Sequence, residues 1–237
     1  MRTVFRPTQG AWSAKDFAQG FAPIAERYEC AWDARPVSDR TRAIVMVSKF
    51  DHCLADLIYR VRTGGLAMDI SAVISNHTAL KSLVEREGIA FIHQPVTQAT
   101  KAQAEAVMFA TMERERAELV ILARYMQILT PEACARLNGR CINIHHSFLP
   151  GFKGANPYSQ AHDRGVKLIG ATAHYATQDL DEGPIIEQMV ERVDHAATVA
   201  DMVHLGQDLE SMTLARALKM HIERRVFVNG RRTVVLR

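Results

Sequence analysis

The segment CINIHHSFLPG, residues 141–151, places an amide and two imidazoles at the end of an apolar run. The polar residues are Asn143, His145 and His146. An amide can donate a hydrogen bond to a carbonyl oxygen that gains negative charge, and an imidazole can do the same or deliver a proton. These residue types therefore fit chemistry at an acyl carbon.

Such chemistry also needs a carboxylate that positions water or accepts a proton, and Asp181 in the acidic turn 179–183 can supply it. Asn143, His145 and Asp181 around one acyl carbon would form an acyl-transfer site without a covalent nucleophile. The serine of the segment, Ser147, lacks the Gly-x-Ser-x-Gly setting of a nucleophile elbow. No cysteine has a suitable neighbour either.

Composition excludes several classes of protein. The 237 residues are 48% hydrophobic and 23% charged, and no apolar run reaches the roughly 18 residues of a membrane span. The first ten residues lack the apolar core of a secretory signal, so we expect a cytoplasmic protein. Lys and Arg exceed Asp and Glu by 29 − 26 = +3, which suits a small anionic substrate and is far weaker than the basic face of a nucleic-acid binder.

Neither the cysteines nor the histidines predict a metal site. The four cysteines are too widely spaced for a zinc knuckle or a redox pair, and we expect them to be reduced. The ten histidines include no pair with HExxH-like spacing, so no catalytic metal is expected.

Apolar, β-branched runs alternate with amphipathic stretches between residues 43 and 145. This pattern predicts a mostly parallel, doubly wound α/β sheet with helices on both faces. Ligands of such sheets bind outside the carboxyl ends of the strands, where Asn143 and His145 are expected. The predicted strands are residues 43–48, 68–75, 90–93, 118–123 and 141–145, and the predicted helices are residues 53–61, 79–87, 101–116 and 131–137.

The pattern changes after residue 150. Residues 167–175 and 184–193 read as two antiparallel strands joined by the acidic turn, and a hairpin around Asn229-Gly230 closes the chain. A long helix from residue 199 to about residue 225 starts at a capping box of Thr198 and Asp201. Its expected apolar face consists of Met202, Leu205, Leu209 and Met212.

Residues 1–38 are expected to form a separate segment ahead of a main domain at residues 42–237. They predict a strand at 3–5, a helix at 14–29 and a strand at 30–33. A segment this small cannot bury enough surface to stand alone.

Several motifs together resemble the folate-dependent formyltransferase family. They are NIH at residues 143–145 with the following Ser147 and Leu149-Pro150, GATAH at residues 170–174 and DEGPII at residues 181–186. Four more stretches are similar to the members that hydrolyse 10-formyltetrahydrofolate to formate and tetrahydrofolate. These are the doubled His145-His146, FKGANPY at residues 152–158, LARYMQIL at residues 122–129 and SKFDHCL at residues 48–54. The resemblance runs over about the whole chain.

The resemblance implies a role for each matching residue. Asn143 and His145 would polarise the formyl oxygen, and Asp181 would orient the attacking water and relay its proton. His174, with Ser147 and His146, would support these three. The residues implied in substrate binding are Arg124, Tyr125, Met126, Gln127, Leu129, Lys153 and Tyr175. Folate would be the substrate, with neither a cofactor nor a metal.

One departure from the family favours hydrolysis of the linear amide C–N bond over transfer. The relative that formylates a ribonucleotide amine carries a glycine-rich turn that cradles the phosphate, whereas residues 48–53 here contain bulky side chains and no glycine. Such a hydrolase would control the one-carbon folate pool, the formate supply and purine biosynthesis. Two alternatives stay open: a formyltransferase that acts on an amine acceptor, and a folate-binding sensor without turnover.

The resemblance also implies that residues 1–38 are part of an ACT-like regulatory domain of βαββαβ form. Half of such a fold would expose sheet edges, so we predict that the chain forms a homo-oligomer. Sedimentation at micromolar concentration measures this directly, and a monomer there would contradict the prediction.

Overall fold

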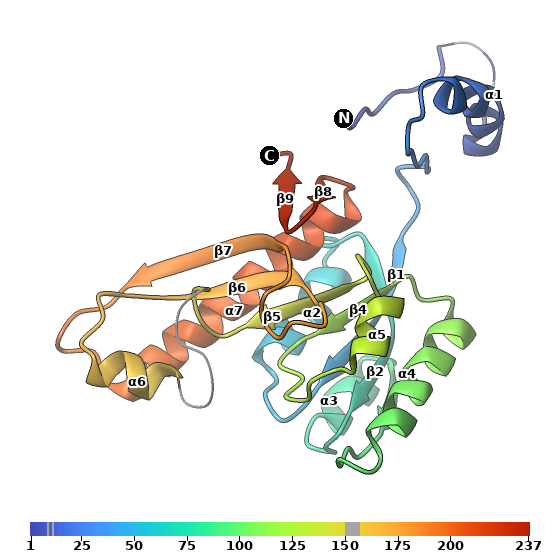
Figure 1. Ribbon diagram of the computed structural model, residues 1–237. Helices are drawn as coiled ribbons and strands as arrows, with labels where there is room; N and C mark the ends of the chain where they lie inside the picture. The colour runs from blue at the N-terminus through green and yellow to red at the C-terminus, as the bar shows by residue number, and fades with distance from the viewer. Residues whose placement is uncertain (9, 11, 150–156) are drawn as a thin grey trace. The chain divides into compact units, whose positions relative to one another are not determined.

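The computed structural model of the protein describes residues 1–8, 10, 12–149 and 157–237 (Figure 1). The chain divides into two compact units, residues 1–40 and residues 41–237, and each is described by itself. Among the helices of the described residues, none is long and apolar enough to cross a membrane.

A seven-stranded sheet forms the centre of the larger unit, in the order β3-β2-β1-β4-β5-β6-β7. The first five strands of this order run parallel, whereas β6 is antiparallel to both β5 and β7. The predicted parallel α/β fold with two antiparallel strands is confirmed. The strands are β1 Thr41–Val47, β2 Met68–Ser75, β3 Ala90–His93, β4 Leu119–Leu122, β5 Cys141–His145, β6 Leu168–Tyr175 and β7 Ile185–Arg192.

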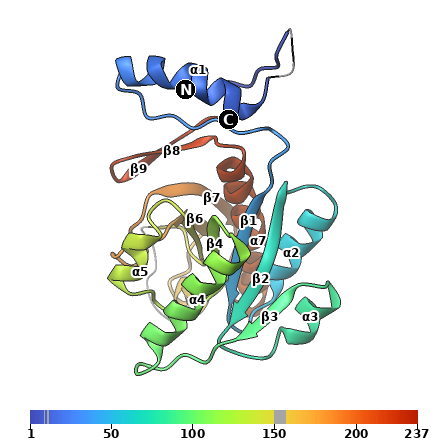
Figure 2. The ribbon, with the colours of Figure 1, turned by 90° about the vertical axis from the view of Figure 1, so that its right-hand side faces the viewer.

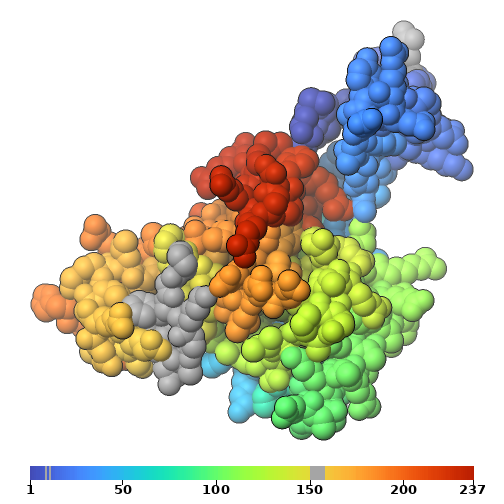
Figure 3. Space-filling model, in the orientation of Figure 1, coloured from blue at the N-terminus to red at the C-terminus, as the bar shows by residue number. Residues whose placement is uncertain are grey.

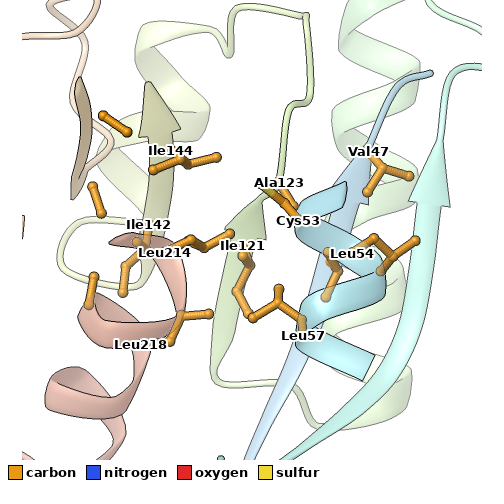
Figure 4. Packing of buried hydrophobic residues seen from close by; sticks show 14 of the residues in the cluster. Val47, Cys53, Leu54, Leu57, Ile121, Ala123, Ile142, Ile144, Leu214 and Leu218 are labelled. Atoms are coloured by element: carbon orange, nitrogen blue, oxygen red, sulfur yellow. The ribbon is translucent and has the colours of Figure 1, made fainter. Parts of the chain in front are cut away.

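Helices cover both faces of this sheet because the central strands are apolar on both sides. Alternate residues of β1 point to opposite faces: Val45 joins a core with α2, α3 and α7, and Met46 joins a core with α4 and α5. Figure 2 shows α4 and α5 on one side and α2 and α3 on the other, and Figure 4 shows α2 and α7 packing on β4 and β5. The helices are α2 His52–Arg62, α3 Lys81–Arg86, α4 Lys101–Glu115, α5 Pro131–Arg136, α6 Pro157–Asp163 and α7 Val199–Ile222.

Helix α7 begins at the predicted capping box. The side-chain oxygen of Thr198 accepts a hydrogen bond from the backbone N–H of Asp201 at 3.1 Å, and the Asp201 carboxylate accepts one from the backbone N–H of Thr198 at 2.9 Å. The two bonds satisfy donors that the first turn of a helix leaves without intrahelical partners.

The predicted apolar face of α7 was partly wrong. Leu205 is only half-buried and Met212 is exposed, whereas Gly206, Glu210 and Thr213 are buried. The reason is that α7 packs against the sheet and also against α2 and α6, so its buried surface is wider than one stripe. Sequence reasoning did not predict α6, which packs on α7.

The chain ends in a two-stranded hairpin of β8 Val226–Asn229 and β9 Arg232–Val235, as predicted. Its turn contains Gly230, whose φ of 61° lies in the region that glycine adopts without steric cost. The hairpin meets the sheet where the hydroxyl of Thr233 donates a hydrogen bond to the carbonyl of Ile185 at the start of β7.

The described residues of the smaller unit contain one helix, α1 Ala14–Arg27, with a capping box of Ser13 and Asp16. The predicted strands at residues 3–5 and 30–33 do not form within the described part of this unit. A strand needs a ladder partner, and these two segments instead contribute aromatic rings to a cluster on α1. The rings of this cluster belong to Phe5, Phe17, Phe21 and Trp32. The ACT-like assignment stays a prediction.

Candidate active site

The three predicted residues of β5 and β6 lie on one face of the sheet. Asn143 pairs with His174 in the β5–β6 ladder, and His145 lies two residues further on the same side. Ile142 and Ile144 point to the opposite face and join the core beneath α7. The strand alternation therefore directs every polar side chain of this segment into one place.

The location differs in part from the expected one beyond the carboxyl end of β5. Asn143 lies in the middle of β5, level with Leu122, the last residue of β4. The site therefore begins at the carboxyl end of β4 and uses the face of the longer β5. The turn between β6 and β7 supplies the missing carboxylate to that face.

The carboxylate of Asp181 lies between two imidazoles. Its Oδ2 is 3.2 Å from Nδ1 of His145, and its Oδ1 is 3.6 Å from Nε2 of His174. The amide nitrogen of Asn143 is 3.2 Å from the same Nε2 of His174. The structure thus brings together Asn143, His145, His174 and Asp181, which the sequence had placed in one site.

The hydrogen-bond partners place a proton on Nδ1 of both rings. Nδ1 of His174 donates to the carbonyl of Tyr175 at 2.9 Å, and Nε2 of the same ring faces the amide of Asn143 and the carboxylate of Asp181. Nδ1 of His145 donates to the Asp181 carboxylate, which can only accept. Nε2 of His145 is buried and has no hydrogen-bond partner among the described residues. This nitrogen can therefore engage a reacting molecule.

Asp181 is ionised. Burial alone would raise the pKa of its carboxyl, but the hydrogen bonds from His145 and His174 outweigh burial and hold the pKa well below the usual range. A carboxylate in this state accepts hydrogen bonds from water and stabilises a neighbouring imidazolium.

The backbone of the β6–β7 turn has a constrained conformation around Asp181. Asp181 has φ 58°, a left-handed conformation that aspartate tolerates better than most residues. A Cβ at Gly183 would overlap the carbonyl oxygen of Tyr175, so the turn approaches the end of β6 closely only with glycine there. Strained backbone of this kind is typical of functional sites.

The C-terminal hairpin contacts the same turn. A guanidinium nitrogen of Arg231 is 3.9 Å from a carboxylate oxygen of Asp179 and 3.8 Å from one of Glu182. In the space-filling view the hairpin, in red, lies directly above the orange turn (Figure 3). The hairpin therefore supports the segment that carries Asp181.

Ser147 and His146 lie beside the group formed by Asn143, His145, His174 and Asp181. The carbonyl of Ser147 accepts a hydrogen bond from the hydroxyl of Thr172 at 2.9 Å, which ties the chain after β5 to β6. The ring of His146 is 5.0 Å from the ring of His145 and 6.5 Å from the ring of Tyr158, between centroids. Burial, and then the charge of Arg124, lower the pKa of His146 to about 4, so its ring is neutral at pH 7.

The predicted substrate-binding residues divide into two groups. The side chains of Tyr125, Leu129 and Tyr175 lie in the core, and Tyr175 hydrogen-bonds His221 of α7 at 2.8 Å, so these three can serve a ligand only through their backbone. Met126 is exposed and Gln127 is half-buried. Lys153 lies outside the described residues.

The loop after β4 is fixed by a hydrogen bond to the loop after β1. The backbone N–H of Met126 donates to the hydroxyl of Ser48 at 3.0 Å, and that hydroxyl donates to Asn76 at 2.7 Å. Exposed apolar side chains stand on the four loops nearest the site, namely Phe50, Met126, Ile128, Phe148 and Leu180. Such a surface suits a flat, largely apolar ligand.

A second buried carboxylate, Glu210 of α7, was missed in the sequence. It is 1% exposed, and its oxygens lie 2.7 Å from Nε2 of His52, 3.0 Å from the hydroxyl of Tyr158 and 3.4 Å from Nε of Arg124. Burial would raise the pKa of Glu210, but the hydrogen bond from His52 and the charge of Arg124 lower it. A glutamate four residues after Gly206 and four before Leu214, on the buried face of α7, was the available signal.

His52, Cys53 and Glu210 are the one set of described residues whose ligand atoms lie close enough for a metal ion, within 4.8 Å of one another. The donor set does not suit a cation. The same oxygen of Glu210 already pairs with His52 and Arg124, and burial raises the pKa of the Cys53 thiol. The expectation of a metal-free site stays a prediction.

Comparisons with known proteins identify the family of the chain. Residues 41–218 match the formyl transferase family. The chain belongs to the formyl transferase family. Within the family it is 49% identical to the formyltetrahydrofolate deformylase of Corynebacterium sp., over 92% of this chain and 76% of that protein.

Solved structures of the formyl transferase family share the fold. The formyltetrahydrofolate deformylase of Burkholderia mallei is 57% identical with a TM-score of 0.91, over 95% of this chain and 80% of that one. The glycinamide ribonucleotide transformylase 1 of Symbiobacterium toebii is 27% identical with a TM-score of 0.78, over 87% of this chain and 98% of that one. This chain is therefore much more similar, in sequence and in structure, to the deformylase than to the transformylase.

The lowered pKa of Asp181 predicts a pH-dependent contribution to stability. Because the folded-state pKa lies below the unfolded one, this contribution is complete above about pH 4 and disappears as the pH falls through the folded pKa. We expect Asp181→Asn to lower the free energy of unfolding by a constant amount between pH 5 and pH 8 and by less below about pH 4. Urea unfolding of the wild type and the variant at each pH measures this free energy.

The matched control is Asp179→Asn, which removes an exposed charge from the same turn and should change the free energy little. If Asp181→Asn lowers the free energy of unfolding as much at the lowest pH as at pH 7, the assignment of an ionised carboxylate is contradicted.

Proposed function

We propose that the protein hydrolyses 10-formyltetrahydrofolate to formate and tetrahydrofolate. The observation that carries the proposal is the ionised carboxylate of Asp181 between His145 and His174, with Asn143 beside them. The two deformylases supply the substrate, because their names state the reaction and their sequences are about half identical to this chain or more.

In the proposed reaction, water attacks the formyl carbon, and the formyl oxygen becomes an oxyanion. The amide of Asn143 and an N–H of His145 would stabilise that charge, and Asp181 would accept a hydrogen bond from the attacking water. The C–N bond then breaks and the folate nitrogen takes up one proton. Formate leaves as an anion and one further proton leaves the site, so atoms and charges balance.

His145 suits a role in moving these protons because its two nitrogens have different surroundings. Nδ1 is held by Asp181, and Nε2 is buried without a partner among the described residues. Asp181 would stabilise the imidazolium whenever Nε2 carries a proton. The hydrogen bond from Nδ1 of His174 to the carbonyl of Tyr175 would keep Nε2 of that ring turned toward Asn143 and Asp181.

The exposed apolar side chains on the surrounding loops favour a substrate with a flat ring system. Met126 and Ile128 stand on the loop after β4, and Leu180 stands on the turn next to Asp181. We infer that the pterin ring binds between this loop and this turn, largely through backbone groups of residues 124–129. A contact of Lys153 with the folate stays a prediction.

The proposed enzyme would regulate the one-carbon folate pool in the cytoplasm without a cofactor. Location, cofactor and oligomeric state are predictions from the sequence. The closer likeness to deformylases than to a transformylase favours water over an amine as acceptor. Formate release without an amine separates the hydrolase from a transferase, and tight folate binding without formate would indicate a sensor.

Asp181→Asn should lower the rate of formate release at least about 10²-fold, because the substituted side chain no longer carries the charge that orients water and stabilises His145. Folate binding should be nearly unchanged. Formate release and tetrahydrofolate binding by calorimetry measure the two quantities, and an unchanged turnover number would remove Asp181 from the mechanism.

Asn143→Ala should lower the turnover number by about 10² to 10³-fold, the cost of losing one donor to an oxyanion. Steady-state kinetics decide between two roles. An effect confined to the Michaelis constant would make Asn143 a binding residue and would contradict its proposed part in the chemistry.

A further inference from the structure

The Glu210 network adjoins the group of Asn143, His145, His174 and Asp181 through His146. The network consists of Glu210 and its three partners His52, Arg124 and Tyr158. The ring of His146 lies between the rings of His145 and Tyr158, and the charges of Arg124 and Glu210 both act on it. His146 therefore lies next to both the group that contains Asp181 and the network of Glu210.

Four structural elements meet in this network. His52 is the first residue of α2, Arg124 follows β4, Tyr158 belongs to α6 and Glu210 belongs to α7. Through His146, these elements adjoin His145, whose buried Nε2 has no hydrogen-bond partner among the described residues. A molecule that approaches this nitrogen from the side of His146 meets the network.

The packing of the network leaves little space. A Cβ at Gly206 would overlap the ring and hydroxyl of Tyr158, so α6 lies directly against α7. The guanidinium of Arg124 lies 4.9 Å from the centroid of the Phe50 ring, and its side chain is 10% exposed. Arg124 also has a left-handed backbone, with φ 63°.

Buried polar atoms that make no hydrogen bond occur in these two clusters. Among the described residues they are Nδ1 of His52, Nε2 of His145, Oγ1 of Thr213 and Nε of Arg124, the last of which still faces Glu210 at 3.4 Å in an ion pair. Thr213 follows Glu210 by one turn of α7 and so shares its side of the helix. Buried groups of this kind bind water or a polar ligand. A tightly packed region with such atoms suits a molecule as small as water.

We propose that Glu210 determines the specificity for the second substrate. By holding Arg124, His52 and Tyr158 together beside His146, it admits water to the formyl carbon and excludes an amine. This inference rests on the proposed hydrolysis. It adds a residue of α7 that contacts neither the formyl group nor the folate.

The two possible acceptors give different products. Water yields formate, one proton and tetrahydrofolate. A primary amine would attack the same carbon, lose one proton to the departing folate nitrogen and give an N-formyl amine and tetrahydrofolate. The ratio of formyl amine to formate therefore measures specificity independently of the total rate.

The test uses methoxyamine, which is larger than water and unprotonated at neutral pH. With wild-type protein, formate should account for the formyl groups released from 10-formyltetrahydrofolate. Glu210→Ala removes the centre of the network, so the ratio of formyl methoxyamine to formate should rise at least about tenfold, the low end of what pocket shape contributes to discrimination. Enzyme-free reactions give the background.

Two further variants make the test decisive. Tyr158→Phe keeps the ring that packs on Gly206 but loses the bond to Glu210, so it should raise the ratio less, and it carries the test if Glu210→Ala does not fold. Glu115→Gln removes a carboxylate that pairs with Arg42 at the amino end of β1, and it should leave the ratio at the wild-type value.

An unchanged ratio in folded variants that still release formate would overturn the role of Glu210 and leave the proposed hydrolysis intact. Wild-type protein that formylates methoxyamine as readily as it releases formate would also overturn the role of Glu210 and leave the proposed hydrolysis intact. Wild-type protein that releases no formate without an amine would overturn both proposals.

Discussion

The site depends on one constraint, namely that an ionised carboxylate must lie between two buried imidazoles. Burial opposes the charge of Asp181, and only the bonds to His145 and His174 reverse that effect. Those bonds need the register that pairs Asn143 with His174 and a turn that folds back over the face of the sheet. Gly183 permits the fold-back, because any side chain there would meet the backbone of β6.

The same principle recurs at Glu210. Removing a carboxylate from water costs several kcal/mol unless partners surround it, and Glu210 has three partners from three other elements. Buried ion pairs are weak evidence for stability, since apolar side chains often serve as well or better. A buried charge that joins α2, α6, α7 and the loop after β4 is therefore better explained by what it does to the site than by what it adds to the fold.

Local signals were sufficient to predict most of the fold. Apolar runs marked β2, β3 and β5 at their observed bounds, and the Thr198 and Asp201 capping box marked the start of α7. The segments at residues 3–5 and 30–33 failed because strand character depends on a ladder partner, which composition does not reveal. Helix α6 gave too short a pattern to recognise.

The site was predictable to the extent that its residues follow strand alternation or a known pattern. Asn143, His145 and His174 met as expected because β5 and β6 pair on one face. Tyr175 was predicted to bind the substrate, and strand alternation turns its side chain toward His221. Glu210 was missed because its three partners come from three separate places in the chain, and a single sequence does not show that they converge.

The order in which these parts appear along the chain has a consequence for synthesis. The parallel strands β1, β2, β3 and β4 precede the turn with Asp181, the helix with Glu210 and the hairpin with Arg231. Domains fold largely as units, from the N-terminus, while the ribosome extends the chain. A nascent chain that already holds half of the sheet therefore has neither carboxylate of the site. The reactive arrangement can assemble only after the last strands are released.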